Sequence, residues 1–240
     1  MRRAFAWLLI LGLLAAGAVL LYGHARRHPE DMPWTALDLG QPIGAFTGRK
    51  LAALTRDGPR CMALLTRAGV RYTFLPARRA SPQCGYDHAV RFAPGGALAI
   101  GYSRGGMAAN CAVAAALALW EWHVVQPAAR RHFGRAVESI DHFGSYNCRR
   151  LYGRDAGAWS EHASANAIDI SGFTLAGGQR ISVARDWGRG GPRALFLEEV
   201  RDGACRLFST VLSPAYNAAH RDHLHFDMAT RGSWGWRSCR

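Results

Sequence analysis

The sequence predicts an α+β domain, with a small and mainly antiparallel sheet flanked by helices, placed after an N-terminal transmembrane helix. Three observations lead to this prediction. The chain begins with one long apolar run, and helical periodicity dominates the first half of the remaining chain. Short β-rich runs separated by Gly, Ser, Asn and Pro dominate its second half. With 240 residues, 49% of them hydrophobic, the chain suffices for one packed domain and is not a disordered one.

The apolar run covers residues 4–22, which is about the length needed to cross the hydrocarbon layer of a membrane. Arg2 and Arg3 precede it, and positive charges at this end favour export of the remainder of the chain. A cleaved signal peptide is the alternative, because residues 16–18 are Ala-Gly-Ala. We therefore expect residues 1–23 to be an anchor or a signal segment. If this segment is an anchor, we expect a single-pass protein of the inner membrane with its domain in the periplasm.

A tether is expected over residues 24–48, because this stretch carries Pro29, Pro33 and Pro42 and few paired apolar positions. The folded domain is then expected over residues 49–240.

Apolar side chains at helical spacing predict one or two short helices over residues 50–68, with a break at Pro59. The strongest helical pattern lies over residues 107–133, where Asn110 is placed to cap an end. Pro127 either kinks this helix or begins a second one. Another helix is expected over residues 193–205, and strands are expected over residues 136–142, 167–175, 180–183, 209–212 and 223–228.

The chain is strongly basic, with 30 Lys and Arg residues against 17 Asp and Glu residues and a net charge of +13. Such a surplus favours anionic partners, such as phospholipid headgroups or wall polymers. Because the arginines are scattered singly and in pairs, we expect no nucleic-acid partner. The sequence leaves the oligomeric state open.

Six cysteines fit an exported chain, in which an even number usually means disulfide bridges. None of them forms a C-x-x-C pair, which argues against a thiolate zinc knuckle or a thioredoxin-type redox site. Of the fifteen possible pairing schemes we favour those in which Cys205 and Cys239 tie the C-terminal tail to the body.

Two distant segments carry the candidate chemistry. In the first, His162 lies on a Ser/Ala/Asn-rich loop and Asp169 follows in the strand-like run AIDISGF. In the second, His223 and His225 are two residues apart on a predicted strand and project from one face. An isolated His-x-His pair is also common on a hydrated strand face. The order His, Asp and His-x-His within one exported domain favours instead the N and O ligands of a zinc site.

The chain resembles the bacterial extensin-like C-terminal domain family, from about residue 33 to the end. The resemblance rests on five stretches. They are GSYNCR at 144–149, SEHASANAIDISGF at 160–173, the Asp186-Trp187 pair, FLEEVRDGACRLFSTVLSP at 196–214 and HRDHLHFD at 220–227.

The motif His-x6-Asp with a late His-x-His is also similar to that of zinc peptidases grouped around lysostaphin, the D-Ala-D-Ala carboxypeptidases and the penicillin-insensitive murein endopeptidases. That resemblance implies Zn²⁺ as cofactor, with His162, Asp169 and His225 as its ligands. It also implies hydrolysis of peptide or amide bonds in peptidoglycan.

The same resemblance offers two candidates for the general base. D-Ala-D-Ala-type relatives place a carboxylate where Asp222 stands, whereas the endopeptidase type shows His-x2-His-x-His, which His220, His223 and His225 match. One candidate is expected to activate water and the other to orient the scissile group.

Three further residues are considered for supporting roles. Arg149 resembles an arginine that faces a substrate carboxylate or the oxyanion, and a surface charge is the alternative. Glu161 and Asp227 are candidates to support the metal-binding histidines. The competing function is a non-catalytic wall-binding module that keeps the zinc-peptidase fold.

Overall fold

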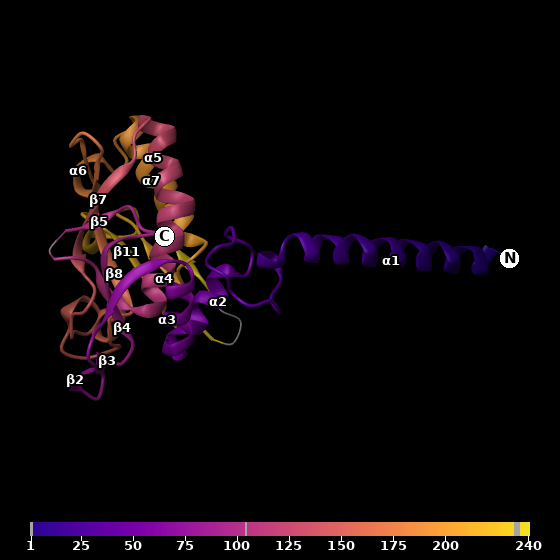
Figure 1. Ribbon diagram of the computed structural model, residues 1–240, viewed down its shortest axis with the longest axis horizontal. Helices are drawn as coiled ribbons and strands as arrows, with labels where there is room; N and C mark the ends of the chain where they lie inside the picture. Colours follow the sequence, from indigo (N-terminus) through magenta and orange to yellow (C-terminus); the bar gives the residue numbers. More distant parts are fainter. Residues whose placement is uncertain (1, 104, 233–235) are drawn as a thin grey trace.

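The computed structural model describes residues 2–103, 105–232 and 236–240, and it shows a long N-terminal helix that leads into a domain of mixed helix and sheet (Figure 1). The sheets are largely antiparallel, which confirms the predicted fold class. The leading helix, α1 (Arg2–Arg27), has no buried residue. In the described part of the chain it is the one helix long and apolar enough to cross a membrane, and a signal sequence near the N-terminus would pass the same test.

The segment expected to be a tether packs onto the domain for most of its length. After η1 (Pro29–Asp31), the side chains of Met32, Leu37, Leu39 and Ile43 are buried. Single apolar residues between prolines carry no periodicity, so the sequence pattern did not reveal this packing. The folded part therefore begins near residue 32 instead of residue 49.

Three short helices follow: α2 (Thr47–Ala53), η2 (Leu54–Arg56) and α3 (Gly58–Arg67). Asp57 caps α3 by accepting a hydrogen bond from Arg60 N at 3.1 Å, and Pro59 lies in its first turn. These helices confirm the prediction for residues 50–68.

Residues 70–110 form strands that the sequence did not predict. An antiparallel sheet contains β1 (Val70–Phe74), β4 (Ala89–Gly96) and β6 (Ala108–Asn110). A separate hairpin contains β2 (Arg78–Ser81) and β3 (Cys84–Tyr86). Most of their side chains are exposed or half-buried, so these strands lack the alternating pattern by which strands are usually recognised.

The long helical region is built in three parts: α4 (Cys111–Trp120), the π-helical segment η3 (Glu121–Val125) and α5 (Gln126–Phe133). Every residue of α4 is buried, so this is a core helix that is apolar on all sides. Asn110 caps it by accepting from Ala112 N at 3.1 Å. Pro127 falls in the first turn of α5, directly after the π segment, and its missing N–H is tolerated there.

The main sheet has the strand order β12-β10-β11-β8-β7-β5, with β9 also paired to β8. The pairs β5–β7 and β10–β12 are parallel, and the other pairs are antiparallel. Its strands are β5 (Gly101–Tyr102), β7 (Val137–Gly144), β8 (Ala167–Leu175), β9 (Arg180–Ser182), β10 (Thr210–Leu212), β11 (Leu224–Asp227) and β12 (Ser238–Cys239). Short helical segments lie in the connections, namely η4 (Leu151–Gly153), η5 (Glu161–Ser164), α6 (Val183–Asp186) and η6 (Ala218–His220).

One face of this sheet is covered by α4 and by α7 (Gly191–Cys205). Trp120 of α4 donates from its indole to Val200 O at 2.8 Å, and its ring meets Phe226 of β11 edge-on at 5.1 Å. Phe173 of β8 packs edge-on against Phe196 of α7 at the same separation. Because these apolar side chains take one face, alternate residues of β8 and β11 project from the other face.

Three disulfides link distant segments: Cys61–Cys111, Cys84–Cys148 and Cys205–Cys239. The predicted pair Cys205–Cys239 is confirmed, and it joins the end of α7 to β12 at the sheet edge. These bridges agree with a domain that folds in an oxidising compartment.

Candidate metal centre

The pairing of β8 with β11 brings the two halves of the candidate site together. Asp169 and His225 are direct partners in the antiparallel register, on the face opposite Ile168, Ile170 and Phe226. Asp169 Oδ1 lies 2.8 Å from His225 Nδ1. The alternation of apolar and polar residues along these strands therefore places the carboxylate and the imidazole side by side.

His162 reaches the same point from the short helix η5. Ser160 caps this helix by accepting from His162 N at 3.3 Å, and Ala165 ends it in a left-handed conformation with φ of 53°. The turn lets His162 Nε2 lie 3.1 Å from Asp169 Oδ2 and 3.3 Å from His225 Nδ1. All three residues are buried, and their ligand atoms lie within 4.8 Å of one another.

The far nitrogen of each imidazole has its own acceptor. His162 Nδ1 lies 2.5 Å from Ser145 O, and His225 Nε2 lies 3.1 Å from Asp227 Oδ2. A carbonyl and a carboxylate can only accept, so each binds an N–H on that far nitrogen. The nitrogen that faces Asp169 donates to this carboxylate when it is protonated and offers a lone pair to a cation when it is not.

The spacing of the ligand atoms suits zinc. A tetrahedral ion with bonds of about 2.0–2.1 Å separates its ligand atoms by about 3.3 Å. The distances between the ligand residues here run from 2.8 Å to 3.3 Å. The three residues therefore offer the N and O donors that zinc takes, close enough together to share one ion.

The electrostatics of the site favour positive charge. Burial alone would raise the pKa of Asp169, but hydrogen bonds from His162 and His225 outweigh it and hold that pKa far below its usual value. Burial would lower the pKa of His225, but Asp169 and Asp227 outweigh it and raise that pKa to about 9. In the protein without metal, a proton on His225 supplies the positive charge that the two carboxylates attract.

The other two histidines lie beside this centre. His223 Nε2 is 3.5 Å from Asp169 Oδ1, and its Nδ1 is 2.9 Å from Asp222 Oδ1. β11 begins only at Leu224, so Asp222 lies in the preceding loop and its side chain is free to meet that of His223. The structure therefore makes the two candidates for the general base a hydrogen-bonded pair.

The ring of His220 lies 5.2 Å from that of His223 and 5.9 Å from that of His225. Its Nδ1 meets Asn217 Oδ1 at 2.8 Å. Burial and the neighbouring histidines lower the pKa of His220 to about 4, so this residue is neutral at physiological pH. A neutral imidazole can hydrogen-bond to a substrate without adding charge.

One cavity of about 350 Å³ connects these groups. It is lined by six of the seven candidate residues, namely Arg149, His162, Asp169, His220, His223 and His225. Arg149 lies in a loop that is tied to the start of η5 by Ser160 N donating to Arg149 O at 3.1 Å. Asp222 lies outside this cavity and lines the neighbouring one.

Two kinds of residue at the site escaped the sequence analysis. Ser145 supports His162 through its backbone carbonyl, which no residue type encodes. Tyr152, Trp159 and Tyr216 line the cavity, and isolated aromatic residues give no spacing signal. Glu161 differs from its expected role, because its carboxylate accepts from Asn166 Nδ2 at 2.6 Å and makes no hydrogen bond to His162.

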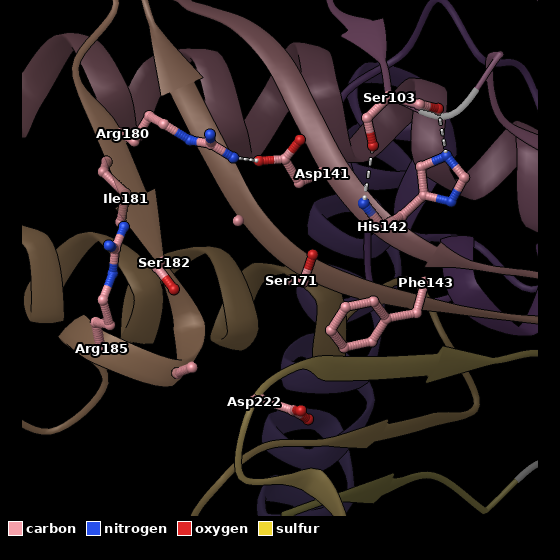
Figure 2. Close-up of a pocket in the computed structure, with 12 residues that line it drawn as sticks. Ser103, Asp141, His142, Phe143, Ser171, Arg180, Ile181, Ser182, Arg185 and Asp222 are labelled. Carbon is pink, nitrogen blue, oxygen red and sulfur yellow. Dashed lines mark hydrogen bonds and ion pairs between the residues drawn. The ribbon is translucent and has the colours of Figure 1, made fainter.

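A second hollow of about 540 Å³ adjoins the metal centre on the same sheet (Figure 2). Figure 2 shows Phe143 and Asp222 on one side of it and the Arg180–Asp141 ion pair on the other. The Phe143 ring lies 5.7 Å from that of His223, so the two cavities share a wall. Ser171 lies on the floor of the hollow, at an irregularity in the pairing of β7 with β8.

Comparison with known proteins yields one result. The sequence profile described as Extensin-like protein C-terminus matches residues 59–240. No curated protein and no solved structure matches the chain.

Proposed function

The chain belongs to the family described as Extensin-like protein C-terminus, and from this premise we propose that it is a membrane-anchored, zinc-dependent hydrolase of amide bonds in cell-wall peptides. The observation that carries the proposal is the convergence of His162, Asp169 and His225, with a separate acceptor behind each imidazole. The same order of ligands in the zinc peptidases named above supports it.

Zinc held by these three residues would supply the Lewis acidity that activates water and polarises a scissile carbonyl. His162, Asp169 and His225 would hold the ion as three protein ligands, the number typical of catalytic zinc sites, whereas structural sites take four. The proposal therefore assigns this centre to hydrolysis and not to a purely structural role.

His223 is placed to move the proton. Asp222 accepts a hydrogen bond from His223 Nδ1, so His223 Nε2 carries a lone pair on the side of the metal centre. That nitrogen can take a proton from the attacking water and return it to the leaving amine. Asp222 acts through His223 by fixing its ring and the position of its proton.

Arg149 provides a positive charge in the same cavity. A guanidinium there can bind a substrate carboxylate through two parallel hydrogen bonds. The hollow behind Phe143 and Asp222 offers space for a second arm of the peptide. A branched or cross-linked peptide would occupy both cavities, which fits a wall substrate.

The proposed cellular location of the protein rests on α1. We propose that it crosses the inner membrane once and leaves the disulfide-bonded domain in the periplasm, where wall peptides are accessible.

The deciding experiment combines metal analysis with a wall digest. The full chain, purified without chelators, should carry about one zinc per molecule and release new amines from sacculi. Chelation should abolish the release, and added zinc should restore it. A chain that holds zinc and sediments with sacculi but releases nothing would support the wall-binding alternative.

A further inference from the structure

The domain lies close to the point where α1 ends. The helix ends at Arg27, and Met32 is already buried in the domain. A fully extended chain from residue 27 to residue 32 covers at most about 18 Å. If α1 spans the membrane, as proposed above, this short connection keeps the domain close to the lipid headgroups. The contacts of α2 indicate which face of the domain lies next to the membrane.

Two contacts place α2 beside this connection. Lys50 Nζ of α2 donates to Thr35 Oγ1 at 2.8 Å, and Ala45 N, just before α2, donates to Asp31 Oδ1 at 2.8 Å. Figure 1 shows α2 on the side of the domain from which α1 leaves, and α6 on the far side. The face around α2 is therefore the face next to the membrane.

This face carries a hollow of about 540 Å³ between α2 and residues 229–232 and 236–237. None of the twelve described residues that line it is acidic. Four of them are arginines, namely Arg49, Arg56, Arg231 and Arg237, and we call this site the arginine hollow.

None of these four arginines forms an ion pair within the described part of the chain, although Arg231 also faces Glu161 across the metal cavity. Arg237 Nη1 donates to Arg206 O at 2.8 Å, and Arg231 Nη2 donates to Thr210 Oγ1 at 2.7 Å. Neutral acceptors thus hold these two guanidinium groups in place. Arg49 and Arg56 are exposed and make no hydrogen bond through their side chains within the described residues. A cluster of this kind favours a ligand with negative charge.

Two tryptophans flank the cluster. Trp236 lines the arginine hollow with 74% of its surface exposed, and Trp34, in the connection to α1, is 71% exposed. Exposed tryptophan is costly in water but favourable at the headgroup level of a membrane. Arginine and tryptophan on one face therefore point to a lipid surface and not to a small anion.

We propose that the arginine hollow docks the domain onto the headgroups of anionic phospholipids. The guanidinium groups pair with lipid phosphates, while Trp34 and Trp236 enter the interface. This inference rests on the membrane anchor proposed above and is independent of zinc and of hydrolysis. Arg231 also lines the metal cavity, so the docked domain would hold its metal centre close to the membrane.

Photo-crosslinking of the full chain in nanodiscs tests this proposal. The probe is a lipid with a diazirine at its headgroup, in phosphatidylcholine alone or in phosphatidylcholine mixed with phosphatidylglycerol. Peptide mapping should place the crosslinks in residues 47–56 and 229–240, with at least about threefold more of them when phosphatidylglycerol is present. The double variant Arg49→Gln/Arg56→Gln should lose most of this gain.

A matched control is Arg185→Gln/Arg189→Gln, which removes the same charge from α6 and the segment after it, on the far side of the domain. It should crosslink as the parent chain does. Equal losses in the two double variants, crosslinks spread evenly over the domain, or retention on sacculi through the same arginines in place of lipid would overturn the inference.

Carbonate extraction separates the two proposals. If carbonate releases the chain from membranes, the anchor fails. The released chain is then mixed with phosphatidylglycerol vesicles. Flotation with the vesicles supports the docking inference, and a chain that remains in solution overturns it.

Discussion

Asp227 lies two residues beyond His225 on β11, and its Oδ2 accepts a hydrogen bond from His225 Nε2 at 3.1 Å. Its other oxygen accepts from Ala229 N at 2.9 Å, so the carboxylate is fixed by its own backbone. Asp227 therefore sets both the ring orientation of His225 and the position of its proton.

The first prediction concerns this support. Asp227→Asn places an amide N–H where His225 needs an acceptor, so the affinity for zinc should fall about 10- to 100-fold. Competition with a metal indicator would measure the loss. Asp155→Asn, at an exposed residue that does not line the metal cavity, serves as the control and should bind zinc as the parent chain does. Equal affinity in both variants would show that Asp227 does not act on the metal centre.

The second prediction concerns a ligand. His162→Ala removes one of three donors and leaves His225 and Asp169 in place, so zinc should be lost from the purified chain. Mass spectrometry of the metal content would measure this. His123→Ala, an exposed histidine outside the centre, should retain about one zinc per chain. Retention of zinc by His162→Ala would require a different set of ligands.

The third prediction separates the paired residues His223 and Asp222. His223→Ala should lower kcat about 10²- to 10⁴-fold while zinc stays bound, because the group that carries the proton is gone. Asp222→Asn should cost about tenfold, because His223 remains but loses the partner that orients it. Both rates would be measured on sacculi at equal zinc content. The reverse order of the two losses would make Asp222 the base.

The fourth prediction concerns Arg149. If its guanidinium binds a substrate carboxylate, Arg149→Gln should raise KM about tenfold and leave kcat nearly unchanged. The comparison is made on soluble wall peptides with a free or an amidated C-terminus, and the amidated peptide should not distinguish the variant from the parent chain. A fall in kcat at constant KM would assign Arg149 to the oxyanion instead.

The fifth prediction concerns Glu121, which lies in the π segment. Its Oε1 accepts from Ala99 N at 2.6 Å and from Ile100 N at 3.2 Å, and burial raises its pKa from 4.5 to about 7 against these hydrogen bonds. Because the folded state holds this proton more tightly than the unfolded state, the free energy of unfolding should fall as pH rises from 4.5 to 7.

The full shift corresponds to about 3 kcal/mol, and solvent screening reduces the expected loss to about 2 kcal/mol. Urea unfolding of the parent chain and of Glu121→Gln at pH 5 and pH 8 would measure it. Glutamine keeps the acceptor oxygen, so the variant should equal the parent chain at pH 5 and exceed it at pH 8. The same stability difference at both pH values would contradict this account.

The sequence predicted the elements of the second half well because their patterns are regular. The strand prediction for residues 167–175 coincides with β8, and the alternation around Asp169 correctly implied one apolar and one polar face. The His-x-His spacing placed His223 and His225 at one cavity, although His223 precedes the strand.

Other features depend on contacts that no local pattern contains. His162 meets Asp169 because Ala165 adopts a left-handed conformation, which is uncommon for alanine and is imposed by the surrounding hydrogen bonds. The strands of residues 70–110 are exposed on much of their surface, and the packing of residues 32–43 relies on isolated apolar side chains. Such features arise from tertiary structure and not from periodicity.

The disulfide between Cys84 and Cys148 ties β3 to Cys148, the residue directly before Arg149. Because this bond persists only where thiols are oxidised, the proposed export implies that the link forms after the domain has crossed the membrane and not before. Under that proposal, synthesis of the chain and completion of the cavity are separated in space. A chain retained in the cytoplasm would lack this disulfide. The proposed activity would then begin only after the domain had reached the far side of the membrane.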